Sequence, residues 1–335
     1  MTGAILGLDF GGSKIAAAVC APDGRLLGEA TVPTRPVEGG DENLSRGLEA
    51  ASRALAAAAA EGEDGAAPAE VVAVGAATFG IPTPGGVLLS PAVPGWDQVS
   101  LAPALRAAFP GANVVVMTDV KAAAAAEARQ GALAGHDPAV YVNLGTGLAV
   151  GIVTGGHVLQ GANGAAGEIG YNLRSPEELR RRPSDRRLLE HVVSGMALSA
   201  TSLERTGQAL SGKAVFEGAE SDRRLRAVLD EMIEELAYHL VNLVVAVDPS
   251  LVAVGGGMVR SWERFAGPLA EALASSVPFP PELVVGAFPF DAPLKGALME
   301  AFEAWGGFVP ALDRPEPAPA PEPAPAPEPV EATPA

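Results

Sequence analysis

Two glycine-rich turns contain residue types that suit the binding of an anion. The first reads DFGGSK and lies between two short apolar runs. Gly11 and Gly12 let the backbone approach an anion because no Cβ intervenes. Ser13 adds a hydroxyl, Lys14 adds a positive charge, and Asp9 is placed to hold a metal ion through water. Alone, such a turn between two strands is usually only a hairpin, and it is not a Walker loop because no helix follows it.

A second polar glycine turn stands at the equivalent place in the second half of the chain, and a third glycine cluster follows a later apolar run. They consist of Gly145, Thr146 and Gly147, and of Gly255, Gly256 and Gly257. Two such hairpins facing each other across a cleft would clamp a triphosphate from both sides. The third cluster precedes a helical pattern, which is where an open α/β sheet leaves room for a nucleotide. The three loops in this order predict a nucleotide site.

The elements that must position these loops repeat in order. We predict strands at 4–9, 15–20, 26–32, 71–77 and 113–117, and again in VYVNLGTG, LAVGIVTGG, HVLQGANG, LVAVGGG and LVVGAF. We predict helices at 43–60, 102–108, 120–134, 225–247, 262–275 and 293–305. Two successive β-β-β-α-β-α series indicate a duplicated α/β fold with a cleft between related halves.

The composition narrows the class of protein. The 335 residues carry a formal net charge of −17, which argues against nucleic acid as a partner. The start is not typical of a signal peptide, and polar residues interrupt the most apolar run, 236–254. We therefore expect a cytoplasmic protein with no membrane span. The single cysteine, Cys20, excludes a disulfide framework and a multi-cysteine metal site.

Two segments stand apart from this pattern. Residues 313–335 are rich in Pro, Ala and Glu, and we expect a disordered, polyproline-like tail. An inert solubilising tail is the favoured interpretation, with a docking strip for a proline-binding partner as the alternative. Residues 175–187 form a charged insert with five arginines. We expect a solvated, mobile surface there rather than a phosphate- or partner-binding patch.

Several motifs together resemble the ROK family, the bacterial sugar kinases and sugar-responsive repressors of the actin-like ATPase superfamily. The resemblance runs from about Ile5 to Trp305 and rests on LGLDFGGSKIAAAV, PGWDQVSL, TDVKAAAAAEARQGAL, NLGTGLAVGIV, GANGAAGEIGY, LLEHVVSGMAL and DPSLVAVGGGMV. The most specific, GANGAAGEIGY, is similar to the family signature GxxGxAGExGH. The resemblance implies two ribonuclease-H-like lobes that close over ATP–Mg²⁺ and a sugar, in homodimers or homotetramers. It implies a small N-terminal lobe of residues 1–118 plus about 292–308, and a large C-terminal lobe of residues 119–291.

The resemblance also assigns roles to single residues. Asp119 matches the family's catalytic aspartate, and a carboxylate that accepts a sugar hydroxyl proton contributes about 10²- to 10⁴-fold in rate. Locally, Thr118-Asp119 before an alanine-rich helix is also an ordinary N-cap. Glu168 and Glu190 match sugar-contacting glutamates, and carboxylates suit sugar hydroxyls because each accepts two donors.

The chain departs from the family pattern around the sugar. Tyr171 stands in place of the signature histidine, Thr118 in place of an asparagine, and Ala92 in place of another sugar-binding asparagine. We expect Thr118 and Tyr171 to belong to the sugar site in their new identities. The family's zinc motif, CxCGxxGC, is absent, and the arginine-rich insert occupies its place. We therefore expect no zinc site.

Two functions from different classes fit these features. The first is an ATP-dependent, glucokinase-like hexose kinase with Asp119 as general base. The second is a non-catalytic sugar sensor that acts through protein partners, with the tail as a possible contact. The sequence leaves open the sugar, the choice between ATP and polyphosphate, and the oligomeric state.

Overall fold

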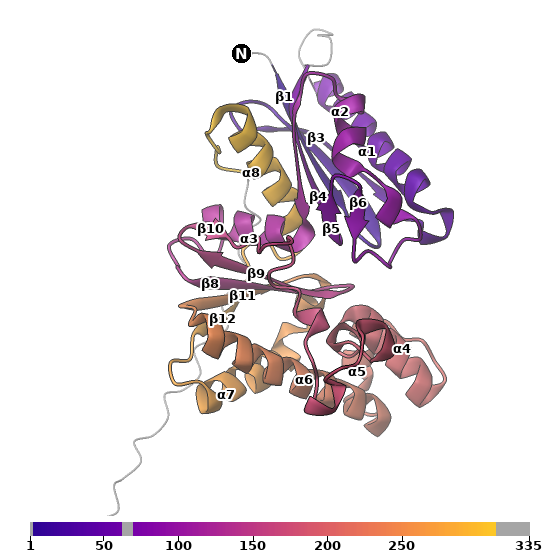
Figure 1. Cartoon of the computed structure of the whole chain (residues 1–335), viewed down its shortest axis with the longest axis vertical. Coiled ribbons are helices and arrows are strands. Elements are labelled where there is room, and N and C mark those ends of the chain that lie inside the picture. Colours follow the sequence, from indigo (N-terminus) through magenta and orange to yellow (C-terminus); the bar gives the residue numbers. More distant parts are fainter. Residues whose placement is uncertain (1–2, 62–69, 313–335) are drawn as a thin grey trace, which may run out of the picture.

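The computed structural model describes residues 3–61 and 70–312 and is built on two five-stranded sheets (Figure 1). The first sheet has the order β3 (Leu26–Pro33), β2 (Lys14–Cys20), β1 (Ala4–Phe10), β4 (Val71–Thr78), β7 (Asn113–Thr118). The second has the order β10 (His157–Val158), β9 (Leu148–Thr154), β8 (Ala139–Leu144), β11 (Leu251–Gly255), β12 (Glu282–Val285). The strands β1 and β8 each pair antiparallel with the next strand and parallel with β4 and β11, respectively. The shared order confirms the predicted duplication.

Helices α3 (Asp119–Gln130) and α8 (Ala292–Gly306) lie between the two sheets (Figure 1). They approach their neighbours at small residues. A Cβ on Gly75 of β4 would lie 1.8 Å from the Ala297 carbonyl oxygen of α8, and a Cβ on Gly151 of β9 would lie 2.3 Å from Ala124 Cβ of α3. The alanine-rich composition of α3 therefore reflects burial between the two halves rather than helix propensity alone.

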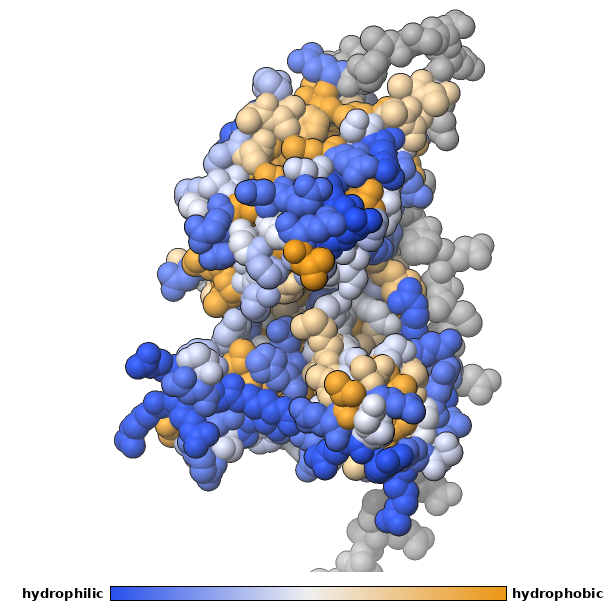
Figure 2. All heavy atoms as spheres, turned by 90° about the vertical axis from the view of Figure 1, so that its right-hand side faces the viewer, coloured by the Kyte–Doolittle hydropathy of each residue, from blue (hydrophilic) through white to orange (hydrophobic). Residues whose placement is uncertain are grey.

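The outer faces of the sheets are covered by the remaining helices. Helices α1 (Gly40–Glu61) and α2 (Leu101–Ala108) cover the first sheet, and α6 (Arg223–Val247) and α7 (Ala266–Ser276) cover the second, with α4 (Gly195–Thr206) and α5 (Gly212–Gly218) beside α6 (Figure 1). On α6, Met232, Leu236, Leu240 and Val244 recur at helical spacing and are buried in the core of the second half. Figure 2 shows the surface narrowing between the two halves.

Several elements differ from the prediction. The hairpin β5 (Ile81–Thr83)–β6 (Gly86–Leu88) and helices α4 and α5 were not predicted. The helix expected at 120–134 begins at Asp119 and ends at Gln130, because the chain turns at Gly131. The helix expected at 262–275 is divided into a 3₁₀ segment, η7 (Gly257–Arg264), and α7. The other 3₁₀ segments are η1 (Pro36–Glu38), η2 (Trp96–Gln98), η3 (Ile169–Tyr171), η4 (Pro176–Glu178), η5 (Pro183–Asp185) and η6 (Leu189–His191).

In residues 3–61 and 70–312, no helix is long and apolar enough to cross a membrane. The expected tail at 313–335 lies outside the described residues.

Candidate active site

The first two glycine turns face each other. The Ser13 Oγ atom lies 3.5 Å from Thr146 Oγ1, and a Cβ on Gly12 would lie 3.7 Å from Thr146 Cγ2. Each turn is closed by one backbone hydrogen bond, from Gly11 N to the Lys14 carbonyl in the first and from Gly145 N to the Gly147 carbonyl in the second. The structure thus brings together two turns that lie more than a hundred residues apart.

The second turn is braced by α4, an element that the sequence interpretation missed. Gly195 N donates to the Gly145 carbonyl oxygen at 2.9 Å, and Met196 N donates to that of Thr146 at 3.4 Å. Ser194 is the N-cap, and its Oγ accepts from Ala197 N at 3.0 Å. Ser194 followed by an apolar run is a helix-start signal that was present in the sequence.

The third glycine cluster lies against the second turn. Gly256 has φ +90°, and a Cβ there would lie 2.5 Å from the Leu144 carbonyl oxygen and 2.7 Å from Asn143 Oδ1. Gly256 N donates to the Pro289 carbonyl oxygen at 2.9 Å. The parallel strands β8, β11 and β12 end at this edge, so all three glycine loops lie around one region.

Two aspartates lie at the carboxyl ends of parallel strands in the first sheet. Asp9 is next to last in β1, and Asp119 is the first residue after β7. Burial and the charge of Asp119 raise the pKa of Asp9 to about 7, against the opposing effect of Lys14. Burial raises the pKa of Asp119 to about 6, although Asp119 Oδ1 accepts a hydrogen bond of 2.7 Å from Val120 N. The N-cap of α3 is Thr118, whose Oγ1 accepts from Lys121 N at 3.3 Å, so Asp119 is not the capping residue.

The two predicted sugar-site glutamates lie near Asp119. Glu190 Oε2 accepts from Leu148 N at 2.9 Å, which fixes this carboxylate beside the second turn. Burial is the main cause that raises the pKa of Glu168 to about 7, with contributions from Asp119 and Glu190. Burial and then the charges of Glu190 and Glu168 raise the pKa of Tyr171. The structure therefore groups Asp119, Glu168, Glu190 and Tyr171 in one region, and their sugar-binding roles stay a prediction.

Lys121 belongs to the same group and was missed. Its side chain is 2% exposed, and Nζ donates to the Gly164 carbonyl oxygen at 2.5 Å. In sequence it reads as one solvated lysine on an alanine-rich helix. The signal that could have revealed it is its position two residues after Asp119, in a helix with no other cation before its last turn.

The charged insert at residues 175–187 is mostly exposed, as expected, but contacts at its ends hold it to the rest of the second half; its mobility stays a prediction. The Arg186 side chain is 6% exposed; it donates to the Tyr171 and Asn172 carbonyl oxygens and pairs with Glu178 at 3.4 Å. Just before the insert, Arg174 pairs with Glu235 of α6 at 2.5 Å. The middle, Arg180 to Arg182, is exposed as expected.

In the part of the chain that the structure describes, no group of three or more His, Cys, Asp or Glu residues is arranged to hold a metal ion, and the absence of zinc stays a prediction.

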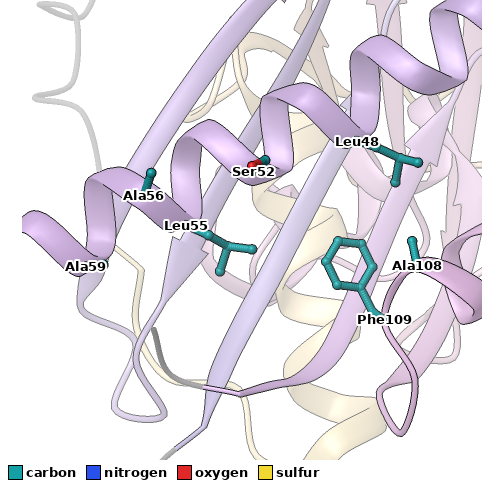
Figure 3. A pocket seen from close by; sticks show the side chains of 7 residues that line it. All are labelled: Leu48, Ser52, Leu55, Ala56, Ala59, Ala108 and Phe109. Carbon is teal, nitrogen blue, oxygen red and sulfur yellow. The ribbon is translucent and has the colours of Figure 1, made fainter. Parts of the chain in front are cut away.

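A cavity of about 510 Å³ lies elsewhere, between α1 and the end of α2 (Figure 3). Its lining is apolar apart from one hydroxyl and consists of Leu48, Ser52, Leu55, Ala56, Ala59, Ala108 and Phe109. None of the predicted site residues lines it.

Comparison with known proteins identifies the family. The model of the ROK family matches residues 5–288. The chain belongs to the ROK family. It is 28% identical over 323 residues to a glucokinase of Thermotoga maritima, and this alignment covers 90% of the chain and 98% of the relative. An N-acetylmannosamine kinase of Escherichia fergusonii is 27% identical, covering 88% of this chain and 97% of the relative.

The fold comparison agrees. The crystal structure of a ROK glucokinase from Streptomyces griseus, in complex with glucose and AMPPNP, is similar with a TM-score of 0.72 at 27% identity. The match covers 89% of this chain and 99% of that one. The duplicated, actin-like ATPase type of fold that the sequence predicted is therefore confirmed.

Proposed function

We propose that this ROK protein transfers the γ-phosphoryl group of ATP to a hexose hydroxyl, with Asp119 as the general base. The observation that supports this most directly is the convergence of two anion-binding turns, joined by the 3.5 Å approach of Ser13 and Thr146, with the carboxylates around Asp119. Phosphoryl transfer depends mainly on alignment and charge neutralisation, and both require donors and acceptors at one place.

The chain is an ATP-dependent sugar kinase at the level that its relatives share. Among these are glucokinases and N-acetylmannosamine kinases. Glucose or another hexose is therefore the first substrate to test, and an N-acyl hexosamine is the second.

The residues of the turns fit a nucleoside triphosphate. In the first half, Gly12 and Ser13 offer backbone amides, Ser13 offers a hydroxyl and Lys14 offers a positive charge, while the Gly11 amide closes the turn. In the second half, Thr146 and Gly147 offer the same donor types, while the Gly145 amide closes the turn. Beside them, Gly257 leaves room, since its Cβ would meet nothing closer than 3.6 Å, whereas Gly255 and Gly256 pack closely against Tyr141 and Leu144. Clamping from both halves couples nucleotide binding to their closure.

Asp9 fits a hydrated Mg²⁺. It is a buried carboxylate beside a second carboxylate, and its raised pKa shows that its negative charge is insufficiently compensated by the protein alone. A divalent cation would supply that compensation and neutralise phosphate charge when bound.

Asp119 fits the base. A sugar hydroxyl is a weak nucleophile at neutral pH, and a carboxylate with a pKa of about 6 is ionised there while remaining a better proton acceptor than a solvated aspartate. Glu168 and Glu190 would accept hydrogen bonds from other sugar hydroxyls, and Thr118 and Tyr171 would complete the pocket.

We also propose the lobe boundaries as 1–118 plus about 292–308, and 119–291. They are supported by the packing of α8 on β1 and β4 of the first sheet. A cytoplasmic homodimer or homotetramer is the expected assembly.

The test is an ADP-release screen with ATP–Mg²⁺ across hexoses, N-acyl hexosamines and a no-sugar control, with polyphosphate as a second donor. We expect sugar-dependent ADP release with at least one hexose. Asp119→Asn should lower kcat by about 10²- to 10⁴-fold while leaving sugar affinity within a few fold. If no sugar stimulates turnover but sugars bind, the kinase proposal is wrong and a non-catalytic sensor remains.

A further inference from the structure

A lysine buried in the first turn of α3 needs a physical explanation. Thr118 is the N-cap, so Lys121 is the third helical residue. A cation near a helix N-terminus is opposed by the helix dipole, and removing it from water adds a further cost. The lysine side chain is nevertheless 2% exposed. Such a placement requires compensation from neighbouring groups.

One compensation is a hydrogen bond to the glycine-rich segment that contains Glu168. Lys121 Nζ donates to the Gly164 carbonyl oxygen at 2.5 Å. The segment turns at Gly161, Gly164 and Gly167, which all have positive φ. Its far end is held on β9, where Val150 N donates to the Gly167 carbonyl oxygen at 2.9 Å. This hydrogen bond therefore ties the segment that leads into Glu168 to helix α3.

The other compensation is electrostatic. The charged neighbours of Lys121 are Glu168, at the end of this segment, and Asp119, on its own helix. Both carboxylates have pKa values that the Lys121 charge lowers and that burial raises. Glu190 of η6 also acts on both carboxylates, and Asp9 of β1 interacts with Asp119. Lys121 is therefore the cation that acts on Asp119 and Glu168, while Lys14 acts on Asp9.

We propose that Lys121 is a positioning residue of this kinase, which fastens the Gly161–Glu168 segment to α3 and places a positive charge between the base, Asp119, and the sugar-binding carboxylate, Glu168. The inference rests on the proposed function and adds to it a residue that governs when the sugar site is competent. With Lys121 present, both carboxylates ionise near neutral pH and can then accept a proton or a hydroxyl hydrogen bond. Without the lysine charge, their pKa values rise and they ionise only at higher pH.

The test compares Lys121→Met and Lys121→Gln with wild type in the full-length protein. Both variants remove the charge, whereas glutamine keeps an amide donor for the Gly164 carbonyl. We expect the acid limb of kcat/KM to move to higher pH by about one unit in both variants, which lowers kcat/KM about tenfold at pH 6. The difference should shrink to within about threefold at pH 9, where the carboxylates are ionised in all three proteins. Lys213→Met, on the exposed surface of α5, is the matched control and should leave the profile unchanged.

A double-mutant cycle with Glu168→Gln tests the partner. If the lysine acts through Glu168, adding Lys121→Met to Glu168→Gln should raise the sugar KM much less than it does in wild type. A pH-independent loss of activity, or a wild-type profile in Lys121→Gln, would assign the lysine only a structural role and overturn the proposal. If Lys121→Met does not fold, Lys121→Gln decides.

Sugar binding separates this proposal from the kinase proposal. Calorimetric titration with the sugar should show a weakening of affinity in Lys121→Met that is larger at pH 6 than at pH 9. If wild type binds sugar without turnover, the kinase proposal fails while this measurement still decides the role of Lys121. If turnover is present and sugar affinity and the acid limb are unchanged in both variants, only the Lys121 proposal fails.

Discussion

A buried carboxylate beside another carboxylate destabilises the unliganded protein at neutral pH. Asp9 is 9% exposed, and its pKa is raised from 3.8 to about 7. An acid with a raised pKa holds its proton more tightly in the folded state than in the unfolded state. Stability from this group is therefore highest below about pH 4, and it falls as pH rises to about 7. The same charge that weakens the apoprotein is the one that suits a bound cation.

Removing the charge of Asp9 should separate these two effects. Asp9→Asn should raise the free energy of unfolding of the apoprotein at pH 8 by about 1–3 kcal/mol, and the gain should vanish at pH 4. The same variant should lower kcat/KM with ATP–Mg²⁺ by at least about 10²-fold. Denaturant titrations at the two pH values measure the first effect. A variant that is less stable than wild type at pH 8 would contradict the role assigned to burial.

At the scale of elements, the glycine loops are fixed by close backbone approach. Gly256→Ala adds a methyl group 2.5 Å from the Leu144 carbonyl oxygen at a φ of +90°, so we expect a loss of about 2–4 kcal/mol in stability and weaker ATP binding. Gly267→Ala in α7 is the matched control, because its Cβ meets nothing within 4 Å. It should stabilise the protein by up to about 1 kcal/mol. Equal effects of both changes would contradict the packing argument.

The arginine insert is an element held by ion pairs and backbone contacts. Arg186→Ala removes a nearly buried side chain that contacts the Tyr171 and Asn172 carbonyls and Glu178, and should cost about 2–4 kcal/mol. Arg181→Ala, at an exposed position, should change stability by less than about 0.5 kcal/mol. The prediction of no zinc is tested by thermal unfolding in excess Mg²⁺ with and without a zinc-selective chelator, which should leave Tm unchanged. A fall in Tm with that chelator would reveal a zinc site and contradict the prediction.

Some elements could be predicted from the local sequence pattern and others could not. The strands β1 and β8 were predictable because each is a buried apolar run that ends in a polar glycine turn. Helix α5 was missed because it has only seven residues, and α4 was missed because it follows a charged segment whose composition suggested mobility, although its N-cap Ser194 was a readable signal. The role of Lys121 was missed because burial of a lysine depends on Gly164 and Glu168, which lie more than forty residues away. Local pattern identifies an element, but long-range contacts decide the environment of a side chain.

At the scale of the whole molecule, the chain returns from the second half to the first near one buried carboxylate. Glu127 of α3 is fully buried and accepts from Ala287 N at 3.0 Å and from Phe288 N at 2.8 Å. These contacts fasten the start of the return crossing, just before α8, to the helix that begins with Asp119. Because the proposed boundary assigns α3 to the large lobe and α8 to the small lobe, these contacts lie where the chain crosses between the lobes and fix the segment before α8 relative to the helix of the proposed base.

The end of the described chain is also fastened to α3. Leu312 is 5% exposed, and its N–H donates to Gln130 Oε1 at 2.9 Å, while Gln130 Nε2 donates to the Pro310 carbonyl oxygen at 2.7 Å. Deleting residues 313–335 should therefore leave Tm and kcat unchanged. Deleting residues 308–335 should lower the free energy of unfolding by about 2–4 kcal/mol, because it exposes apolar surface around Leu312 and leaves the amide of Gln130 without its partners. Differential scanning fluorimetry and the ADP-release assay on both truncations measure these outcomes. A loss of sugar phosphorylation on deleting only residues 313–335 would contradict the inert-tail interpretation, because it would show that catalysis depends on these residues.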